Sequence, residues 1–286
     1  MRDLVISFSG GETSAYMAQW LVANKAKEYD RIFCVFANTG QENEETLEFV
    51  NRCAEHFDLN VYWIEADVYH GERKGTGHKN VSYETASRNG GPFEEVIKKY
   101  GIPNKAYPHC TRELKLQPIK SWLKEMEITD YHMAVGIRAD EIDRMQADAK
   151  KKGLIYPLVK LGITKPDVNL FWANQAFRLS LKGYQGNCKW CWKKSLRKHL
   201  TLLNESPEAY SFPERMEAEH GLSGHNVDGN KRVFFRNNLS TRDLKELARK
   251  PFSPAEDDSV IYPEPDLFGF DLDLSGGCSE SCEVEF

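Results

Sequence analysis

A short turn near the N-terminus has the residue types of an anion-binding loop. The turn Ser9-Gly10-Gly11-Glu12-Thr13-Ser14 follows the apolar run Leu4–Phe8 and precedes a helical pattern. Two glycines let the backbone adopt positive φ angles and come close to a ligand. Hydroxyl groups and N–H groups at a helix start suit a phosphate, which the helix dipole also favours. We therefore expect a phosphate to be bound here, and the alternative is an ordinary strand-to-helix turn with a hydroxyl cap. The candidate ligands are Ser7, Ser9, Gly10, Gly11, Thr13 and Ser14.

A second polar group follows a later apolar run, Tyr131–Val135. It reads Gly136-Ile137-Arg138-Ala139-Asp140-Glu141-Ile142-Asp143-Arg144. Guanidinium groups make bidentate contacts with sulfate and phosphate. We expect Arg138 to hold the anionic end of a substrate with help from Arg144, while the acidic residues orient the arginines or bind a metal. The alternative is a solvated helix start with internal salt bridges.

Cysteines form the third group. Cys188-Lys189-Trp190-Cys191 follows the glycine-bearing turn 183–187, whose N–H groups could bond metal-bound sulfurs. A Cys-x-x-Cys pair in a reducing compartment indicates a metal site or a redox dithiol. Cys34 falls in a strand pattern and Cys53 in a helix pattern, so we expect both to be small core residues.

The elements that must position these residues alternate between strand and helix. Strands are predicted at Leu4–Phe8, Ile32–Ala37 and Asn60–Ile64, with helices near 14–27 and 42–57 between them. This order predicts an α/β fold with a doubly wound, mostly parallel five-stranded sheet. Ligands of such sheets lie at the carboxyl ends of the strands. The second strand ends there with Ala37, Asn38, Thr39 and Gly40, which we expect to line the same crevice as the glycine loop.

The rest of the chain is divided by composition. Residues 69–108 read as a long irregular loop, which suggests a functional segment or lid. Helices are predicted at about 112–126, 168–181, 196–203 and 207–219. We predict a nucleotide-binding α/β domain over 1–182, the Cys-x-x-Cys loop with a helical extension over 183–250, and an acidic tail over 251–286.

The ordered segments resemble the phosphoadenosine phosphosulfate (PAPS) reductase-like branch of the adenine nucleotide alpha-hydrolase superfamily. The superfamily's pyrophosphate loop (PP-loop) reads Ser-Gly-Gly-x-Asp-Ser, and Thr13 stands here at the Asp position. The Asn38-Thr39-Gly40 turn and the Gly136-x-Arg138 segment also match the branch. The resemblance implies that ATP or another adenine nucleotide, such as an adenylyl sulfate, is bound in the crevice. Magnesium is a further candidate cofactor, although a hydroxyl cannot hold the ion as a carboxylate would.

The resemblance also joins the distant cysteines. Adenylylsulfate reductases with an iron–sulfur cluster carry Cys-Cys-x-x-x-Lys-x-x-Pro and a distant Cys-x-x-Cys. This chain keeps Cys110, Lys115 and the Cys188/Cys191 pair, with His109 in place of the first cysteine. The resemblance implies a 4Fe-4S cluster on the three cysteines. The imidazole of His109, or a tail cysteine such as Cys282, would supply the fourth ligand. An open fourth iron, a zinc site and free thiols remain alternatives, and Lys115 is expected to help Arg138.

The implied activity is sulfur transfer or adenylation-type chemistry on a small-molecule or nucleic-acid acceptor, with a reductant protein and a homodimer as further expectations. Cys278 of the tail could attack a sulfonyl sulfur as a thiolate. One alternative is a tRNA or DNA thiolation enzyme that holds its polymer on the Trp190/Trp192 basic run. The other is a nucleotide-sensing protein with a structural metal centre and no turnover.

Composition excludes several classes. The chain has 286 residues, 41% of them hydrophobic, which suffices for a large core. Its net charge of -5 argues against non-specific nucleic-acid binding. No run of about 18 apolar residues occurs, so we expect no membrane span and a cytoplasmic location.

Overall fold

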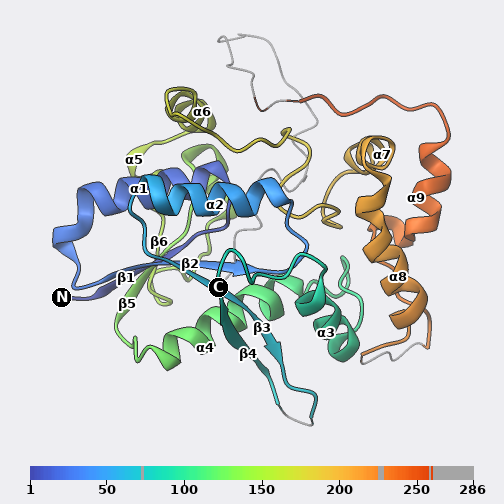
Figure 1. Cartoon of the computed structure of the whole chain (residues 1–286), viewed down its shortest axis with the longest axis horizontal. Coiled ribbons are helices and arrows are strands. Elements are labelled where there is room, and N and C mark those ends of the chain that lie inside the picture. Colours follow the sequence, from blue (N-terminus) through green and yellow to red (C-terminus); the bar gives the residue numbers. More distant parts are fainter. Residues whose placement is uncertain (72–73, 225–228, 258, 260–286) are drawn as a thin grey trace.

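One six-stranded sheet forms the centre of the molecule (Figure 1). The structure is a computed structural model that describes residues 1–71, 74–224, 229–257 and 259. The strand order is β4-β3-β2-β1-β5-β6, and every pair is parallel except β3 with β4. The predicted doubly wound, mostly parallel sheet is therefore confirmed, with six strands in place of five. The strands are β1 (Asp3–Ser7), β2 (Ile32–Asn38), β3 (Val61–Val68), β4 (Thr76–Val81), β5 (Tyr131–Ala134) and β6 (Leu154–Ile155).

Helices cover both faces of this sheet. Alternate residues of a strand point to opposite faces, and in β1 Leu4 belongs to one apolar core whereas Val5 belongs to another. The first core includes α1, α2, α5 and α6, and the second includes α4 on the opposite face (Figure 1). The bounds are α1 (Glu12–Lys25), α2 (Glu44–His56), α3 (Gly91–Tyr100), α4 (Gln117–Glu125), α5 (Pro157–Leu161) and α6 (Lys165–Ala173).

Two cysteines lie inside the first core, as expected. Cys34 on β2 and Cys53 on α2 are both free and almost fully buried. Burial raises the pKa of the Cys34 thiol to about 12, because the interior disfavours a thiolate. These two thiols are therefore structural and serve as controls for the other cysteines.

The segment 69–108 is more regular than its sequence indicates. The expectation of a long irregular loop is wrong, since β4 and α3 both lie within it. The strand β4 is an edge strand with the sequence Thr-Gly-His-Lys-Asn-Val, so it lacks the apolar alternation that identifies a strand. Backbone pairing with β3 stabilises it instead.

The C-terminal extension packs beside α3 (Figure 1). It contains α7 (Leu196–Glu205), α8 (Ser211–His220) and α9 (Thr241–Ala248), and the sequence predicted the first two but not the third. Aromatic residues of the extension, including Phe212 and Phe234, form one core with Phe93 and Val96 of α3. The extension thus shares its apolar core with the sheet domain. Between 251 and 257 the described tail contains no helix or strand.

Candidate functional site

The glycine loop joins β1 to α1 at the carboxyl end of the strand. Gly10 has a φ of +86°, and a Cβ atom there would lie 2.7 Å from Thr46 Cγ2 on α2. Only glycine fits both the backbone conformation and the space. By contrast, Gly11 is the N-cap of α1 with an extended φ of -95°. The loop therefore approaches α2 at Gly10, while α1 begins directly after Gly11.

The hydroxyl of Ser14 closes the loop on itself. Its Oγ accepts hydrogen bonds from the Ser9 N–H at 3.2 Å and the Ser9 hydroxyl at 3.0 Å, and it donates to the Gly11 carbonyl at 2.9 Å. The Ser14 side chain is fully buried. In this structure Ser14 shapes the loop from within, where the sequence suggested a direct phosphate ligand.

Arg138 lies against the same loop. Its Nη1 donates to Thr13 Oγ1 at 3.1 Å, and its Nε lies 3.1 Å from Asp140 Oδ1. Arg138 is only 4% exposed, so it is not part of a solvated helix start. Arg144 is about one-third exposed and pairs with Glu141. Thr13, which stands where the superfamily pattern has an Asp, thus contacts the guanidinium of Arg138.

Hydrogen bonds between buried groups fix the turn that follows β2. Asn38 is fully buried, and its Nδ2 donates to Glu65 Oε1 at 2.6 Å and to the Ser87 carbonyl at 2.9 Å. Thr39 donates to the carboxylate of Glu42 through both its N–H and its hydroxyl. The structure leaves the side chains of this turn little surface for a nucleotide. The remaining predicted contacts Ser7, Ala37, Gly40 and Gly136 are also buried at these strand ends.

Three cysteines from two distant segments line one pocket. Cys110 comes from the segment before α4, and Cys188 and Cys191 come from the turn before α7. The structure thus brings together the three residues that the sequence proposed as metal ligands. The pocket, which we call the cysteine pocket, is lined by Thr39, Gln41, Phe93, Cys110, Thr111, Leu114, Lys115, Cys188, Trp190, Cys191 and Trp192.

Two lysines with almost no exposed surface flank these cysteines. Lys115 belongs to a π-helical turn, Arg112–Leu116, and is 6% exposed. Such turns insert an extra residue into a helix and often occur at functional sites. Lys194, which is 2% exposed, donates from Nζ to the Cys188 carbonyl at 2.5 Å. The sequence did not single out Lys194, although its place three residues after Cys191 is a signal that could have identified it.

A buried carboxylate accompanies Lys115. Glu42 is 3% exposed, and burial raises the pKa of its carboxyl while the charge of Lys115 opposes that rise. The two side chains therefore place charges of both signs beside the cysteine pocket. We expect the lysine charge to favour thiolate at the nearby cysteines.

The cysteine turn is bonded directly to the glycine loop. Asn187 Nδ2 donates to the Ser9 carbonyl at 2.9 Å, and Asn187 is 4% exposed. Asn43 Nδ2 donates to the Gly186 carbonyl at 2.8 Å, and the Lys189 N–H donates to the Gln41 carbonyl at 3.0 Å. A single turn thus links the candidate phosphate site to the cysteine pocket.

His109 does not join the cysteines. Its Nε2 lies 3.0 Å from the Gly101 carbonyl oxygen, and its ring lines a different pocket. Burial lowers the pKa of this imidazole. His109 and Cys110 are adjacent in the sequence but line separate pockets. The expectation that His109 supplies the fourth metal ligand therefore does not match this geometry. Cys278 and Cys282 lie outside the described residues.

The tryptophans of the basic run are core residues. Trp190 is 2% exposed and Trp192 is 6% exposed. Trp190 stacks on Phe212 and donates from Nε1 to Gln41 Oε1 at 2.5 Å. The interpretation of this run as a base-stacking surface is therefore wrong, because the indoles are needed for the core.

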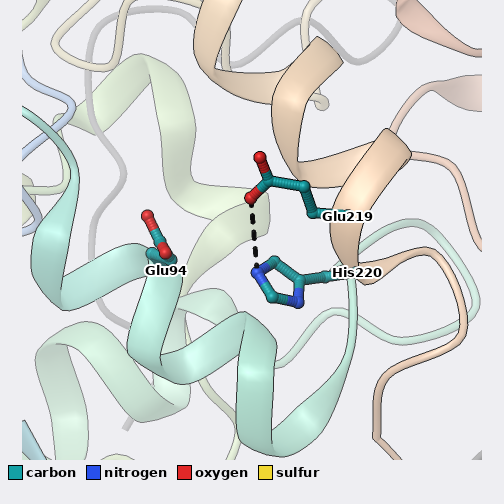
Figure 2. Close-up of side chains that lie close together, drawn as sticks. All are labelled: Glu94, Glu219 and His220. Atoms are coloured by element: carbon teal, nitrogen blue, oxygen red, sulfur yellow. Dashed lines mark ion pairs between the residues drawn. The ribbon is translucent and has the colours of Figure 1, made fainter.

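A further group of metal-ligating types joins α3 to α8 (Figure 2). The ligand atoms of Glu94, Glu219 and His220 lie within 4.8 Å of one another. However, Arg215 Nη1 lies 2.9 Å from Glu94 and 3.4 Å from Glu219, and Lys98 also pairs with Glu94. These cations balance both carboxylates, which favours an ion-pair network between the two helices.

Among the described residues, none of the helices is long and apolar enough to cross a membrane.

Residues 3–151 match the phosphoadenosine phosphosulfate reductase domain. An uncharacterised nin region protein of Escherichia phage lambda is 30% identical over 98% of this chain and 94% of its own length. An uncharacterised protein of Methanocaldococcus jannaschii is 33% identical over 42% of this chain, which is 22% of that protein. The crystal structure of a PAPS reductase from Candida auris, in a phosphate complex, shares 16% identity with a TM-score of 0.35 over 61% of this chain and 74% of that one. The match to the domain, which spans more than half of the chain, shows that this protein belongs to the PAPS reductase domain family.

Proposed function

We propose that the chain binds an adenine nucleotide at the glycine loop and performs sulfur-transfer or adenylation-type chemistry with a 4Fe-4S cluster in the cysteine pocket. The observation that carries the proposal is the convergence of Cys110, Cys188 and Cys191 on one pocket. The hydrogen bond from Asn187 to Ser9 supports a functional link between the two sites.

The choice of a cluster over zinc rests on the resemblance. Cys110, Lys115 and the Cys188/Cys191 pair match the pattern of reductases that carry an iron–sulfur cluster. A tetrahedral zinc site could also use cysteine ligands. Analysis of iron, sulfide and zinc distinguishes the two metal centres.

The chain's own residues have separable roles in this proposal. Cys110, Cys188 and Cys191 would hold the cluster, which supplies electron transfer or a binding position for sulfur when present. Lys115 and Lys194 offset the negative charge of the thiolates. Arg138 binds the anionic part of the nucleotide beside Thr13. Three cysteines would leave one cluster position for a further ligand or for substrate.

A nucleotide-sensing role without turnover is the second candidate. It is favoured by Thr13, whose hydroxyl contacts Arg138 where the superfamily pattern has an Asp. Magnesium-dependent hydrolysis uses carboxylate oxygens as metal ligands. Nucleotide binding with no pyrophosphate release would therefore support the sensing role.

The test uses protein purified without oxygen, with labelled ATP in the presence and absence of magnesium. Gly11→Val should fold, because the φ of Gly11 is compatible with a β-branched residue, but it should block phosphate approach and abolish ATP binding. Gly10→Val is the matched variant: its strained φ and clash with Thr46 predict loss of the fold itself. Unchanged ATP affinity in Gly11→Val would refute the proposed nucleotide site. Release of pyrophosphate from ATP would support an enzyme, whereas ATP binding without pyrophosphate release would support a sensor.

A further inference from the structure

A second pocket opens on the other side of the turn that carries Cys110. Its volume is about 430 Å³, and it shares no lining residue with the cysteine pocket. His109 and Arg112, which flank Cys110 and Thr111 in sequence, both line it. The turn 109–112 therefore separates two cavities. We call this second cavity the Tyr107 pocket, and it is lined by Tyr100, Ala106, Tyr107, Pro108, His109, Arg112 and Arg232.

The pocket presents an aromatic ring supported from beneath. The guanidinium carbon of Arg232 lies 3.8 Å from the centre of the Tyr107 ring. Arg232 is 8% exposed and donates from Nη1 to the Tyr100 carbonyl at 3.1 Å, so it is a fixed support. Tyr107 remains 39% exposed. A planar ligand would stack on the exposed part of this ring.

The charge of the pocket is positive. Arg112 and Arg232 are cationic, and the Arg112 side chain is 56% exposed. No carboxylate is among the described residues that line the pocket. The adjacent Glu113 is buried and bonds to Arg112 Nε at 2.6 Å and to the Thr76 hydroxyl at 2.5 Å.

We propose that the Tyr107 pocket binds a nucleotide unit, with the base on Tyr107 and the phosphate near Arg112. A base has the flat π-face that stacks on an exposed aromatic ring, and arginine adds both charge and hydrogen bonds to a phosphate. The half-exposed guanidinium of Arg112 lies at the same pocket, so a ligand with both a base and a phosphate matches the lining better than an uncharged aromatic compound. The nucleotide unit could belong to a free mononucleotide or to a single strand of nucleic acid.

This site is independent of the glycine loop, and the experiment keeps the two apart. A fluorescein-labelled short oligouridylate is titrated with the wild-type protein and with Gly11→Val, which lacks the proposed glycine-loop site, and fluorescence anisotropy reports binding. Unlabelled uridine monophosphate is added as competitor. Competition by the mononucleotide at the affinity of the oligomer assigns the pocket to free nucleotides, whereas much tighter binding of the oligomer assigns it to a nucleic-acid strand.

Variants identify the residues. Tyr107→Ala should weaken binding about tenfold or more, as expected for loss of one base stack, whereas Tyr107→Phe should keep wild-type affinity. Arg112→Gln should weaken binding and reduce the slope of log affinity against log salt by about one. The control variants are Tyr69→Ala, an exposed tyrosine outside the pocket, and Arg242→Gln, an arginine with an 84% exposed side chain. Both should bind as wild type.

Absence of binding by both ligands, or equal affinity of wild type and Tyr107→Ala, would overturn the inference. Circular dichroism of each variant excludes unfolding as the cause of lost binding. ATP affinity is measured separately with Gly11→Val. A failure at the Tyr107 pocket therefore leaves the proposed function untouched, and the reverse also holds.

Discussion

Thr13 and Arg138 form the residue pair that most distinguishes this loop from the superfamily pattern. Their side chains lie 3.1 Å apart, and the Arg138 guanidinium is oriented by Asp140. A fixed guanidinium beside the start of α1 adds positive charge to the helix N-terminus, where an anion is already favoured. We therefore expect the proposed anion site to depend on the geometry of Arg138 more than on net charge.

Arg138→Lys should weaken ATP binding by about tenfold while the fold is retained. Lysine keeps the charge but loses the planar fork that contacts both Thr13 and Asp140. Isothermal titration of ATP into both proteins measures the effect. Arg242→Lys is the matched control, since the Arg242 side chain is 84% exposed on α9. Wild-type affinity in Arg138→Lys would show that the guanidinium does not hold the nucleotide.

His199 predicts a dependence of stability on pH. It is 2% exposed on α7, its Nδ1 lies 2.7 Å from the Tyr210 hydroxyl, and burial lowers its pKa to about 3. In the unfolded chain a histidine has a pKa of about 6.5. Between these two values the unfolded state binds more protons, so stability falls as the pH drops below about 6.5.

Protonation of His199 in the unfolded chain should lower the free energy of unfolding by about 2 kcal/mol at pH 5. His199→Asn retains a polar atom near the Nδ1 position and removes the titration. Urea unfolding of both proteins at pH 7.5 and pH 5 measures the difference, which should be smaller in the variant. An equal loss in both proteins would show that other groups dominate the acid sensitivity.

At the scale of elements, the turn 186–191 is the main connection between the two sites. It is bonded to the glycine loop through Asn187 and to the start of α2 through Asn43, and it carries Cys188 and Cys191. A change in the glycine loop on nucleotide binding would therefore reach the cysteines through hydrogen bonds.

Asn187→Ala should weaken ATP binding about fivefold, the effect of losing one hydrogen bond of about 1 kcal/mol. It should also reduce the amount of metal that the cysteine pocket retains. Asn174→Ala is the control, because Asn174 Nδ2 also donates to a carbonyl, at 2.8 Å, but at the exposed end of α6. Metal analysis and ATP titration measure both effects. If Asn187→Ala matched the control in both, the turn would not couple the sites.

The sequence predicted the elements whose apolar pattern is strong. Buried parallel strands such as β1 and β2 are continuous apolar runs, and the helix that follows each was recognised from its pattern. The edge strand β4 was missed because its register depends on β3 and not on its own composition. The helix α9 was missed although Ser240 and Asp243 form a capping box, since a short helix gives little periodicity.

Prediction of the site was limited by the direction of side chains. The resemblance joined Cys110, Cys188 and Cys191, and all three line one pocket, whereas their role as metal ligands stays a prediction. Neighbouring residues could not be assigned in the same way. His109 precedes Cys110 but lines another pocket, and Trp190, which lies between Cys188 and Cys191, forms a buried wall of the cysteine pocket.

At the scale of the whole molecule, the cysteine pocket lies between the sheet domain and the helical extension. Cys110 and Lys115 come from the sheet domain, whereas Cys188 and Cys191 belong to the extension. The shared core of α3 with α7 and α8 holds the two parts together. A metal centre bound by both parts would stabilise the folded chain in addition to any chemistry, because a ligand that binds only the folded state shifts the folding equilibrium.

The central claim is that Cys110, Cys188 and Cys191 hold one metal centre, and metal content tests it most directly. Each protein is purified without oxygen and reconstituted with iron and sulfide, and iron, sulfide and zinc are then measured beside the visible absorption spectrum. Wild type, Cys34→Ala and Cys53→Ala should contain iron and sulfide in equal amounts. Each of Cys110→Ala, Cys188→Ala and Cys191→Ala should lose most of both. Wild-type protein that holds neither iron nor zinc, or three pocket variants that keep the full wild-type content, would contradict the claim.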